Sequence, residues 1–155
     1  MADMIYVLPI AGLTALTAVP FAQLATPATT GIEILWIELG QETSETSQQE
    51  ALQLVRRSTN STLPNVAERP SLNEGGPATL LGATSITNAI GVATGTGSFT
   101  ASLTKFTFNA LNGLLYLPVP EERITISPSK FLTLEFPTAP AANTWSGYIT
   151  YRELT

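Results

Sequence analysis

The chain has 155 residues, a net charge of −5 and neither cysteine nor histidine. This excludes disulfides, thiolate metal sites, cysteine nucleophiles and every catalytic triad built around an imidazole. Charged residues make up 12% of the chain, against about 25% in typical soluble proteins, while threonine occupies 23 positions and serine 11. Because threonine favours strands, we expect one all-β domain over residues 1–155, with a surface that can lie against other subunits without desolvating many charges.

Positive charge is scarce in the first third of the chain, where no Lys or Arg precedes Arg56. Nucleic acid is therefore not an expected partner, because no basic stripe is available to neutralise phosphates. The apolar start "MIYVLPIAGLTALTAVPFAQL" lacks a positive leader and is interrupted by proline and threonine, so it fits neither a signal peptide nor a membrane span. We expect no membrane partner, and we expect residues 1–30 to form an arm or the first strands.

The segment "GIEILWIELG" at residues 31–40 alternates as a strand does. The alternation predicts two faces: Ile32, Ile34 and Trp36 on one, and Glu33, Leu35 and Ile37 on the other. Apolar residues on both faces indicate a strand covered on both sides, by the core and by a neighbour. The polar segment 41–49 predicts a hairpin connection to a returning strand at 50–59.

Residues 58–100 change composition to Ser, Thr, Asn, Gly, Ala and Pro. Such a long excursion within a compact domain is often functional or bound to a partner. Its apolar residues predict that part of it packs, either as strand or as a clamping arm on another subunit; the sequence leaves both alternatives open.

Five short apolar runs follow, each ended by Pro, Gly, Asn or Ser: 103–110, 113–120, 123–128, 131–137 and 145–154. In the last, one face should carry Trp145, Ile149 and Tyr151. About eight strands at this spacing predict an antiparallel β-sandwich, with the jelly roll as the commonest eight-stranded form.

The stretch "PEERI" raises the question of a catalytic carboxylate pair at Glu121 and Glu122. Adjacent residues of an extended chain point to opposite faces, so we expect instead a charged corner in which Arg123 pairs with one of them, on the surface or between subunits. The candidate intersubunit contacts are Glu121, Glu122, Arg123, Trp36, Arg56 and Arg57.

Other constellations favour structural roles. The pattern of carboxylates in the polar hairpin favours a solvated loop over a calcium site, because the chain has one Asp and no short-spaced Asp pattern. These carboxylates are Glu38, Glu42, Glu45 and Glu50. Trp36 and Trp145 would make a sugar platform only if exposed and coplanar, and burial is the favoured alternative. We expect no metal, no cofactor and no enzymatic activity.

Six segments together resemble a family of small structural proteins of tailed bacteriophages: "IYVLP" at 5–9, "EILWIELGQ" at 33–41, "EALQLVRRST" at 50–59, "YLPVPEERITISP" at 116–128, "LTLEFPTAPA" at 132–141 and "WSGYITYREL" at 145–154. The resemblance runs almost end to end and is weakest over 60–100. It carries over no functional residue.

The resemblance implies a jelly-roll-like head decoration, or cement, protein. Such a protein would bind the major capsid protein on the outer surface of the virion as a symmetric oligomer, often a homotrimer, and assemble in the host cytoplasm. Two alternatives stay open: a receptor- or glycan-binding jelly-roll module of a tail or fibre, and a glycosidase-like sandwich with two facing glutamates.

Overall fold

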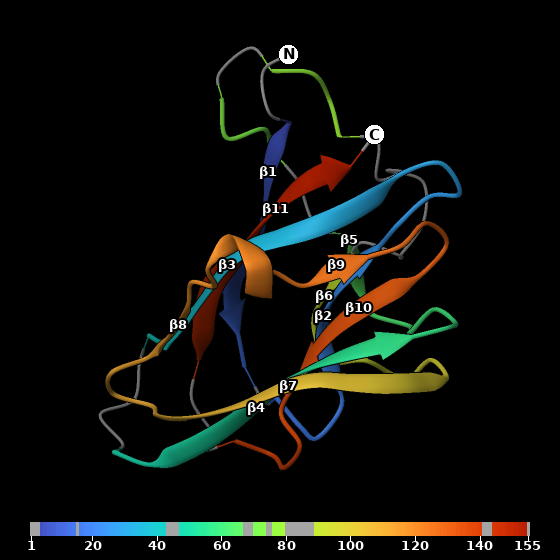
Figure 1. Cartoon of the computed structure of the whole chain (residues 1–155). Helices are drawn as coiled ribbons and strands as arrows, with labels where there is room; N and C mark the ends of the chain where they lie inside the picture. Colours follow the sequence, from blue (N-terminus) through green and yellow to red (C-terminus); the bar gives the residue numbers. More distant parts are fainter. Residues whose placement is uncertain are drawn as a thin grey trace.

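The computed structural model describes residues 4–14, 16–42, 47–66, 70–73, 76–79, 89–140 and 144–154. Two antiparallel sheets pack face to face as a β-sandwich (Figure 1). Sheet A has the order β1 (Ile5–Leu13), β11 (Trp145–Leu154), β3 (Gly31–Gln41) and β8 (Leu114–Tyr116), with β9 (Thr125–Ile126) also pairing with β3. Sheet B has the order β5 (Asn65–Val66), β6 (Ala89–Ile90), β2 (Pro20–Ala25), β10 (Phe131–Glu135), β4 (Gln49–Arg57) and β7 (Phe99–Asn109).

The eight main strands have the connectivity of a jelly roll. The first pairs with the last, the second with the second-last, and so inward: β1 with β11, β2 with β10, β3 with β8, and β4 with β7, all antiparallel. The pairs β11–β3 and β10–β4 then complete the two sheets. The predicted sandwich is confirmed, and the strand order is the jelly-roll order.

Large aromatic side chains fill the space between the sheets. Trp145 is fully buried and contacts Phe108 edge-on, with ring centroids 6.0 Å apart, and Phe136 at 5.2 Å. Tyr6 and Tyr151 meet at the β1–β11 end, with their ring centroids 5.7 Å apart. The three residues predicted to share one face of the last strand, Trp145, Ile149 and Tyr151, are all buried in the core.

A β-bulge in β3 changes which side chains face outward. Thr150 of β11 pairs with Trp36 while Tyr151 pairs with Ile34, so Leu35 is an extra residue in β3. The bulge shifts the alternation by one position. Ile32, Ile34, Ile37 and Leu39 face the core, and Trp36 lies half-buried on the outer face. The predicted grouping of Trp36 with Ile32 and Ile34 was therefore wrong.

The segment expected to be an arm or first strands, residues 1–30, supplies strands β1 and β2 in its described part, one in each sheet. Within 58–100, β5 and β6 extend sheet B beside β2, and Thr62 forms an isolated bridge with Gly95. Part of the excursion thus packs as strand on its own subunit. Residues 67–69, 74–75 and 80–88 lie outside the described residues.

Two described parts of the β4–β7 connection, around residues 60–61 and 97, lie on the outer side of sheet B, whereas residues 70–72 hydrogen-bond and bridge to β1 at the edge of sheet A. Ser61 donates its backbone N–H to Gln23 of β2 over 2.9 Å, and Gln23 also contacts Asn60. Gln23 and Thr133, which alternate with inward residues of β2 and β10, are fully buried. The chain thereby covers the part of this outer face around Gln23 and Thr133 with its own connection.

Candidate interaction surface

The outer face of sheet A holds apolar and aromatic side chains from neighbouring strands. Strand register puts Pro9 beside Tyr148, Tyr148 beside Glu38, and Glu38 beside Leu115. In the adjacent row, Val7 pairs with Thr150, and Thr150 with Trp36. We call this surface, with its six apolar or aromatic members, the sheet A face: Val7, Pro9, Trp36, Leu115, Leu117 and Tyr148.

Three exposed apolar side chains follow one another at every second position from Leu115 in β8. Leu115, Leu117 and Val119 are 63%, 68% and 55% exposed, and we call them the apolar stripe. Between them, Tyr116 is half-buried and Pro118 is buried. Three consecutive outward apolar residues on an extended segment form a surface suited to a protein partner.

A hydrogen-bonded trio lies within the sheet A face. Tyr148 donates its hydroxyl hydrogen to Glu38 Oε2 over 2.6 Å, and Trp36 also hydrogen-bonds to Tyr148. The bond to the Glu38 carboxylate is the main cause of a Tyr148 pKa above its ordinary value, because ionising the phenol would break the bond and bring two negative charges together. These contacts hold the aromatic side chains in fixed orientations.

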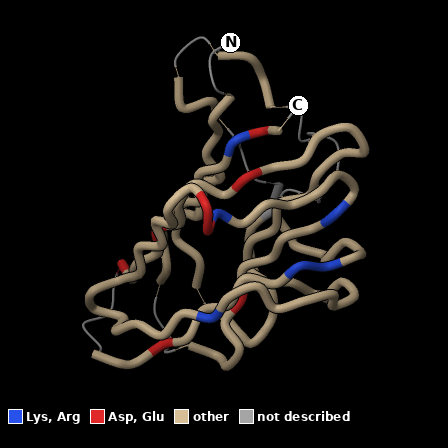
Figure 2. Tube along the Cα trace, in the orientation of Figure 1, with Lys and Arg blue, Asp and Glu red and all other residues tan. Residues whose placement is uncertain are grey.

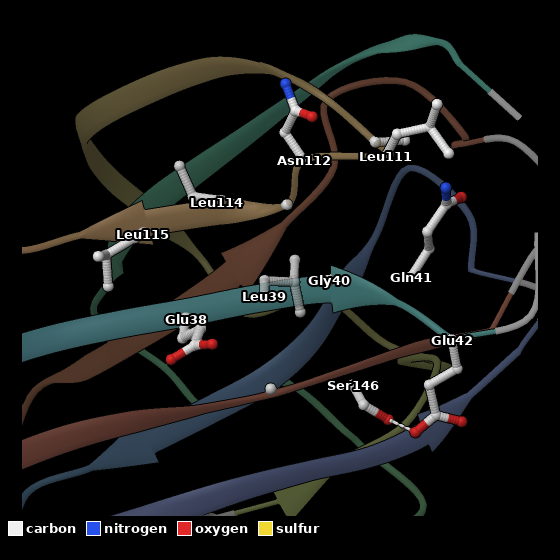
Figure 3. A pocket seen from close by; sticks show the side chains of 13 residues that line it. Glu38, Leu39, Gly40, Gln41, Glu42, Leu111, Asn112, Leu114, Leu115 and Ser146 are labelled. Carbon is white, nitrogen blue, oxygen red and sulfur yellow. Dashed lines mark hydrogen bonds between the residues drawn. The ribbon is translucent and has the colours of Figure 1, made fainter. Parts of the chain in front are cut away.

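A pocket of about 350 Å³ opens where β3 passes between β11 and β8 (Figure 3). The described residues that line it include Glu38, Glu42, Leu114, Leu115, Asn112 and Ser146, and none of them is a Lys or Arg. Glu42 accepts a hydrogen bond from Ser146, drawn as a dashed line in Figure 3.

The two pocket glutamates do not have the spacing of a glycosidase pair. Four residues of extended chain place their Cα atoms about 13 Å apart. The two side chains would have to lean toward each other to bring their carboxyl groups within the roughly 5 to 9.5 Å that a glycosidase pair needs. Figure 3 shows the two side chains apart, and each carboxylate hydrogen-bonds a different hydroxyl of β11.

The corner at Glu121 and Glu122 is a 3₁₀ turn, η1 (Pro120–Glu122), rather than extended strand. Both glutamates are exposed, and Tyr116 donates its hydroxyl hydrogen to the Glu122 carbonyl over 3.3 Å. The predicted pairing of Arg123 with one of them was wrong, because Arg123 lies 3.6 Å from Glu33 Oε2. Arg152 approaches the same oxygen at 2.5 Å, so two arginines share one carboxylate at one end of the sheet A face.

The two arginines at the end of β4 have different surroundings. Arg56 donates to the Thr125 carbonyl of β9 over 3.0 Å and so joins the two sheets. Arg57 is 5% exposed and donates to Thr133, to the Gly97 carbonyl and to Glu135. An intersubunit role does not fit Arg57, because its guanidinium is buried within its own subunit.

The remaining predicted residues also have defined positions. Trp145 is in the core and Trp36 is on the outer face of sheet A, so the two do not form one sugar platform. In the acidic hairpin, Glu50 is buried, contrary to the expected solvated loop, and Glu45 lies outside the described residues. Among the described residues, no group of three or more His, Cys, Asp or Glu side chains is placed to hold a metal ion.

Two further properties concern the described chain as a whole. Figure 2 shows its Lys and Arg residues spread over separate strands and loops rather than gathered into one stripe. No helix in the described segments has the length and apolar character needed to cross a membrane.

Sequence reasoning missed the apolar stripe as a surface. The signal was present in "LLYLPVP" at residues 114–120, but apolar residues at nearly every position hide which set faces solvent.

Comparison of the chain with protein-family models, curated proteins and solved structures found no match. The resemblance to phage head proteins therefore continues below as a proposal.

Proposed function

We propose that the protein is a non-enzymatic structural protein of a bacteriophage virion that binds the outer surface of the capsid shell and stabilises it. The observation that carries the proposal is the contrast between the two sheets. The outer face of sheet B is covered over Gln23 and Arg57 by the chain's own β4–β7 connection, whereas the sheet A face presents the apolar stripe to solvent. An exposed apolar face of this kind is suited to burial against another protein.

The fold and composition support the same proposal. Jelly rolls are common among viral capsid proteins and lectins. With 12% charged residues, the surface loses little charge hydration when it is buried between subunits. On a symmetric shell, weak contacts repeated many times give strong attachment, and a homotrimer at local threefold positions would multiply them further.

Co-sedimentation with phage heads stripped of accessory proteins tests the proposal. We expect saturable binding with a copy number near one trimer per local threefold position. Leu117→Glu should abolish this binding, because it places a charge in the centre of the apolar stripe. Its free energy of unfolding should change by no more than about 0.5 kcal/mol, because Leu117 is 68% exposed.

Phe99→Glu is the matched control. Phe99 is 64% exposed, but it begins β7 of sheet B and lies outside the sheet A face. This variant should bind heads as the native chain does. Absence of binding by the native chain, or equal loss of binding in both variants, would overturn the proposal.

A receptor- or glycan-binding role on a tail or fibre is the second candidate. One observation favours it: Trp36, Tyr148 and Glu38 form a fixed aromatic and carboxylate group on an outer face. Glycan sites commonly combine a ring for stacking with a hydrogen-bond acceptor. Saturable binding to host glycans, lost in Trp36→Ala, together with no binding to stripped heads, would favour this candidate over capsid decoration.

A further inference from the structure

Strand β8 lies at the edge of sheet A. It pairs with β3 through three residue pairs, Leu114 with Leu39, Leu115 with Glu38 and Tyr116 with Ile37. Within the described segments, the opposite edge of β8 forms no ladder with another strand. The backbone N–H and C=O groups of such an edge can pair with an added strand.

The side chains beside this edge repeat every two residues. Leu115, Leu117 and Val119 are exposed, and the residues between them are more buried. A period of two matches an extended partner, whose own side chains alternate in the same way, and does not match a helix. Cross-strand neighbours on one face lie about 5 Å apart, so an added strand would place its alternate side chains against the stripe.

Both ends of the stripe are acidic. At the Leu115 end, Glu38 and Glu42 line the pocket, and no Lys or Arg is among the described residues around it. At the other end, η1 exposes Glu121 and Glu122, while the next residue, Arg123, faces Glu33. Leu115 and Val119 are four positions apart, or about 13 Å of extended chain, and the acidic groups lie beyond both ends of that span. A complementary segment therefore carries a cation at each end and apolar side chains between.

We propose that the β8 edge binds an extended segment of a partner protein as an added strand of sheet A. The segment is about seven residues long, with apolar side chains at alternate positions and a Lys or Arg at each end. The partner's first cation enters the pocket beside Glu38 and Glu42, and its last one meets Glu121 and Glu122. This inference rests on the proposed function, in which the segment belongs to the capsid protein.

A labelled synthetic peptide tests the inference on the full chain. The probe is fluorescein-Lys-Thr-Val-Thr-Val-Thr-Lys, which puts both Val and both Lys side chains on one face of the extended peptide, and fluorescence anisotropy measures its binding at low salt. We expect saturable binding with a Kd in the micromolar range, weakened at least about tenfold by Leu117→Glu and unchanged by Phe99→Glu. The same peptide with Glu in place of both Lys residues should bind at least about tenfold more weakly.

Backbone methylation separates strand addition from non-specific apolar binding. A strand uses the N–H groups of one edge only, so N-methylation of the even-numbered residues should abolish binding and that of the odd-numbered residues should spare it, or the reverse. Equal binding by both methylated peptides, equal binding by the Lys and Glu peptides, or no binding up to about 1 mM would overturn the inference.

The same peptide, added as a competitor in the head co-sedimentation, separates the two proposals. If heads bind the protein and the peptide neither binds nor competes, strand addition is wrong while capsid decoration stands. If the peptide binds with the expected selectivity and heads do not, the edge is a binding site but its partner is not the capsid shell.

Discussion

Arg57 and Glu135 form an ion pair with a 2.6 Å separation beneath the β4–β7 connection, on the side of sheet B that faces away from the core. Their side chains are 5% and 10% exposed. Gln53 donates to the second Glu135 oxygen over 2.7 Å, and Arg57 also donates to the Gly97 carbonyl over 2.7 Å. The pair therefore joins β4, β10 and the connection that covers them.

Removing one member of this pair should destabilise the fold strongly. Arg57→Ala leaves the Glu135 carboxylate buried without its cation, and we expect a loss of about 3 to 5 kcal/mol in the free energy of unfolding, measured in urea. The double variant Arg57→Met with Glu135→Leu removes both charges and should lose less than Arg57→Ala alone. A double variant whose loss equals the sum of two large single losses would contradict this account.

Gly97 should tolerate no side chain. A Cβ added there would lie 2.1 Å from the Thr59 carbonyl oxygen, a backbone atom that cannot move without displacing the connection. We expect Gly97→Ala to cost about 1 to 3 kcal/mol of stability, measured by urea unfolding.

Gly95→Ala provides the control for Gly97, because its added Cβ would lie 3.4 Å from the Thr62 hydroxyl oxygen, a side-chain atom. Its stability should fall much less than that of Gly97→Ala. Equal losses in the two variants would show that the close approach at Gly97 does not limit the fold.

Stability should be insensitive to pH near neutrality and should fall in alkali. The chain has no His or Cys, so no side chain of those types titrates between about pH 5 and 9. Burial is the main cause of raised pKa values for Tyr6 and Tyr116, and the Glu38 hydrogen bond is the main cause for Tyr148.

The sign of the alkaline effect follows from these raised values. As the pH rises past about 10, the tyrosines of the unfolded chain lose their phenol protons before those of the folded chain. The stability contributed by these tyrosines is therefore fully present below that pH, and it is lost as the pH rises through their pKa values in the folded state. Urea unfolding at about pH 7, 9 and 11 checks this. Tyr148→Phe should show a smaller alkaline loss, and a native chain that becomes more stable above about pH 10 would contradict it.

Arg123 should contribute little to folding. Glu33 retains Arg152 at 2.5 Å when Arg123, at 3.6 Å, is removed. We expect Arg123→Ala to lower the free energy of unfolding by less than about 1 kcal/mol, and Arg152→Ala to lower it more. Thermal unfolding of both variants measures the difference, and a larger effect at Arg123 would reverse the assignment of the main partner.

Local patterns predicted the strands well and the details of their faces less well. Turn residues between short apolar runs predicted the sandwich, and the alternation in "WSGYITYREL" predicted the shared face of Trp145, Ile149 and Tyr151, which are all buried. The bulge at Leu35 was not predictable from β3 alone, because it is defined by the register with β11. One extra residue was enough to move Trp36 off the face that it was expected to share with Ile32 and Ile34.

The ion pairs were not predictable from local patterns either. Arg57 and Glu135 are separated by 78 positions, and Arg152 and Glu33 by 119. Strand order brings each pair together, and no local pattern marks one carboxylate among several as the partner. The neighbouring Glu121 and Glu122 therefore seemed the natural partners of Arg123, although the fold places Glu33 closer.

The position of β11 between β1 and β3 affects how the chain reaches its native state. β1 has β11 as its strand neighbour on the inner side, and β11 is the final strand of the chain. During synthesis β1 must wait for residues more than a hundred positions downstream before its ladder with β11 can form, and the edges of β1 and β3 that pair with β11 stay unpaired until then. Such non-local closure is intrinsically slow and exposes strand edges to aggregation, so the growing chain is most vulnerable just before its last strand is added.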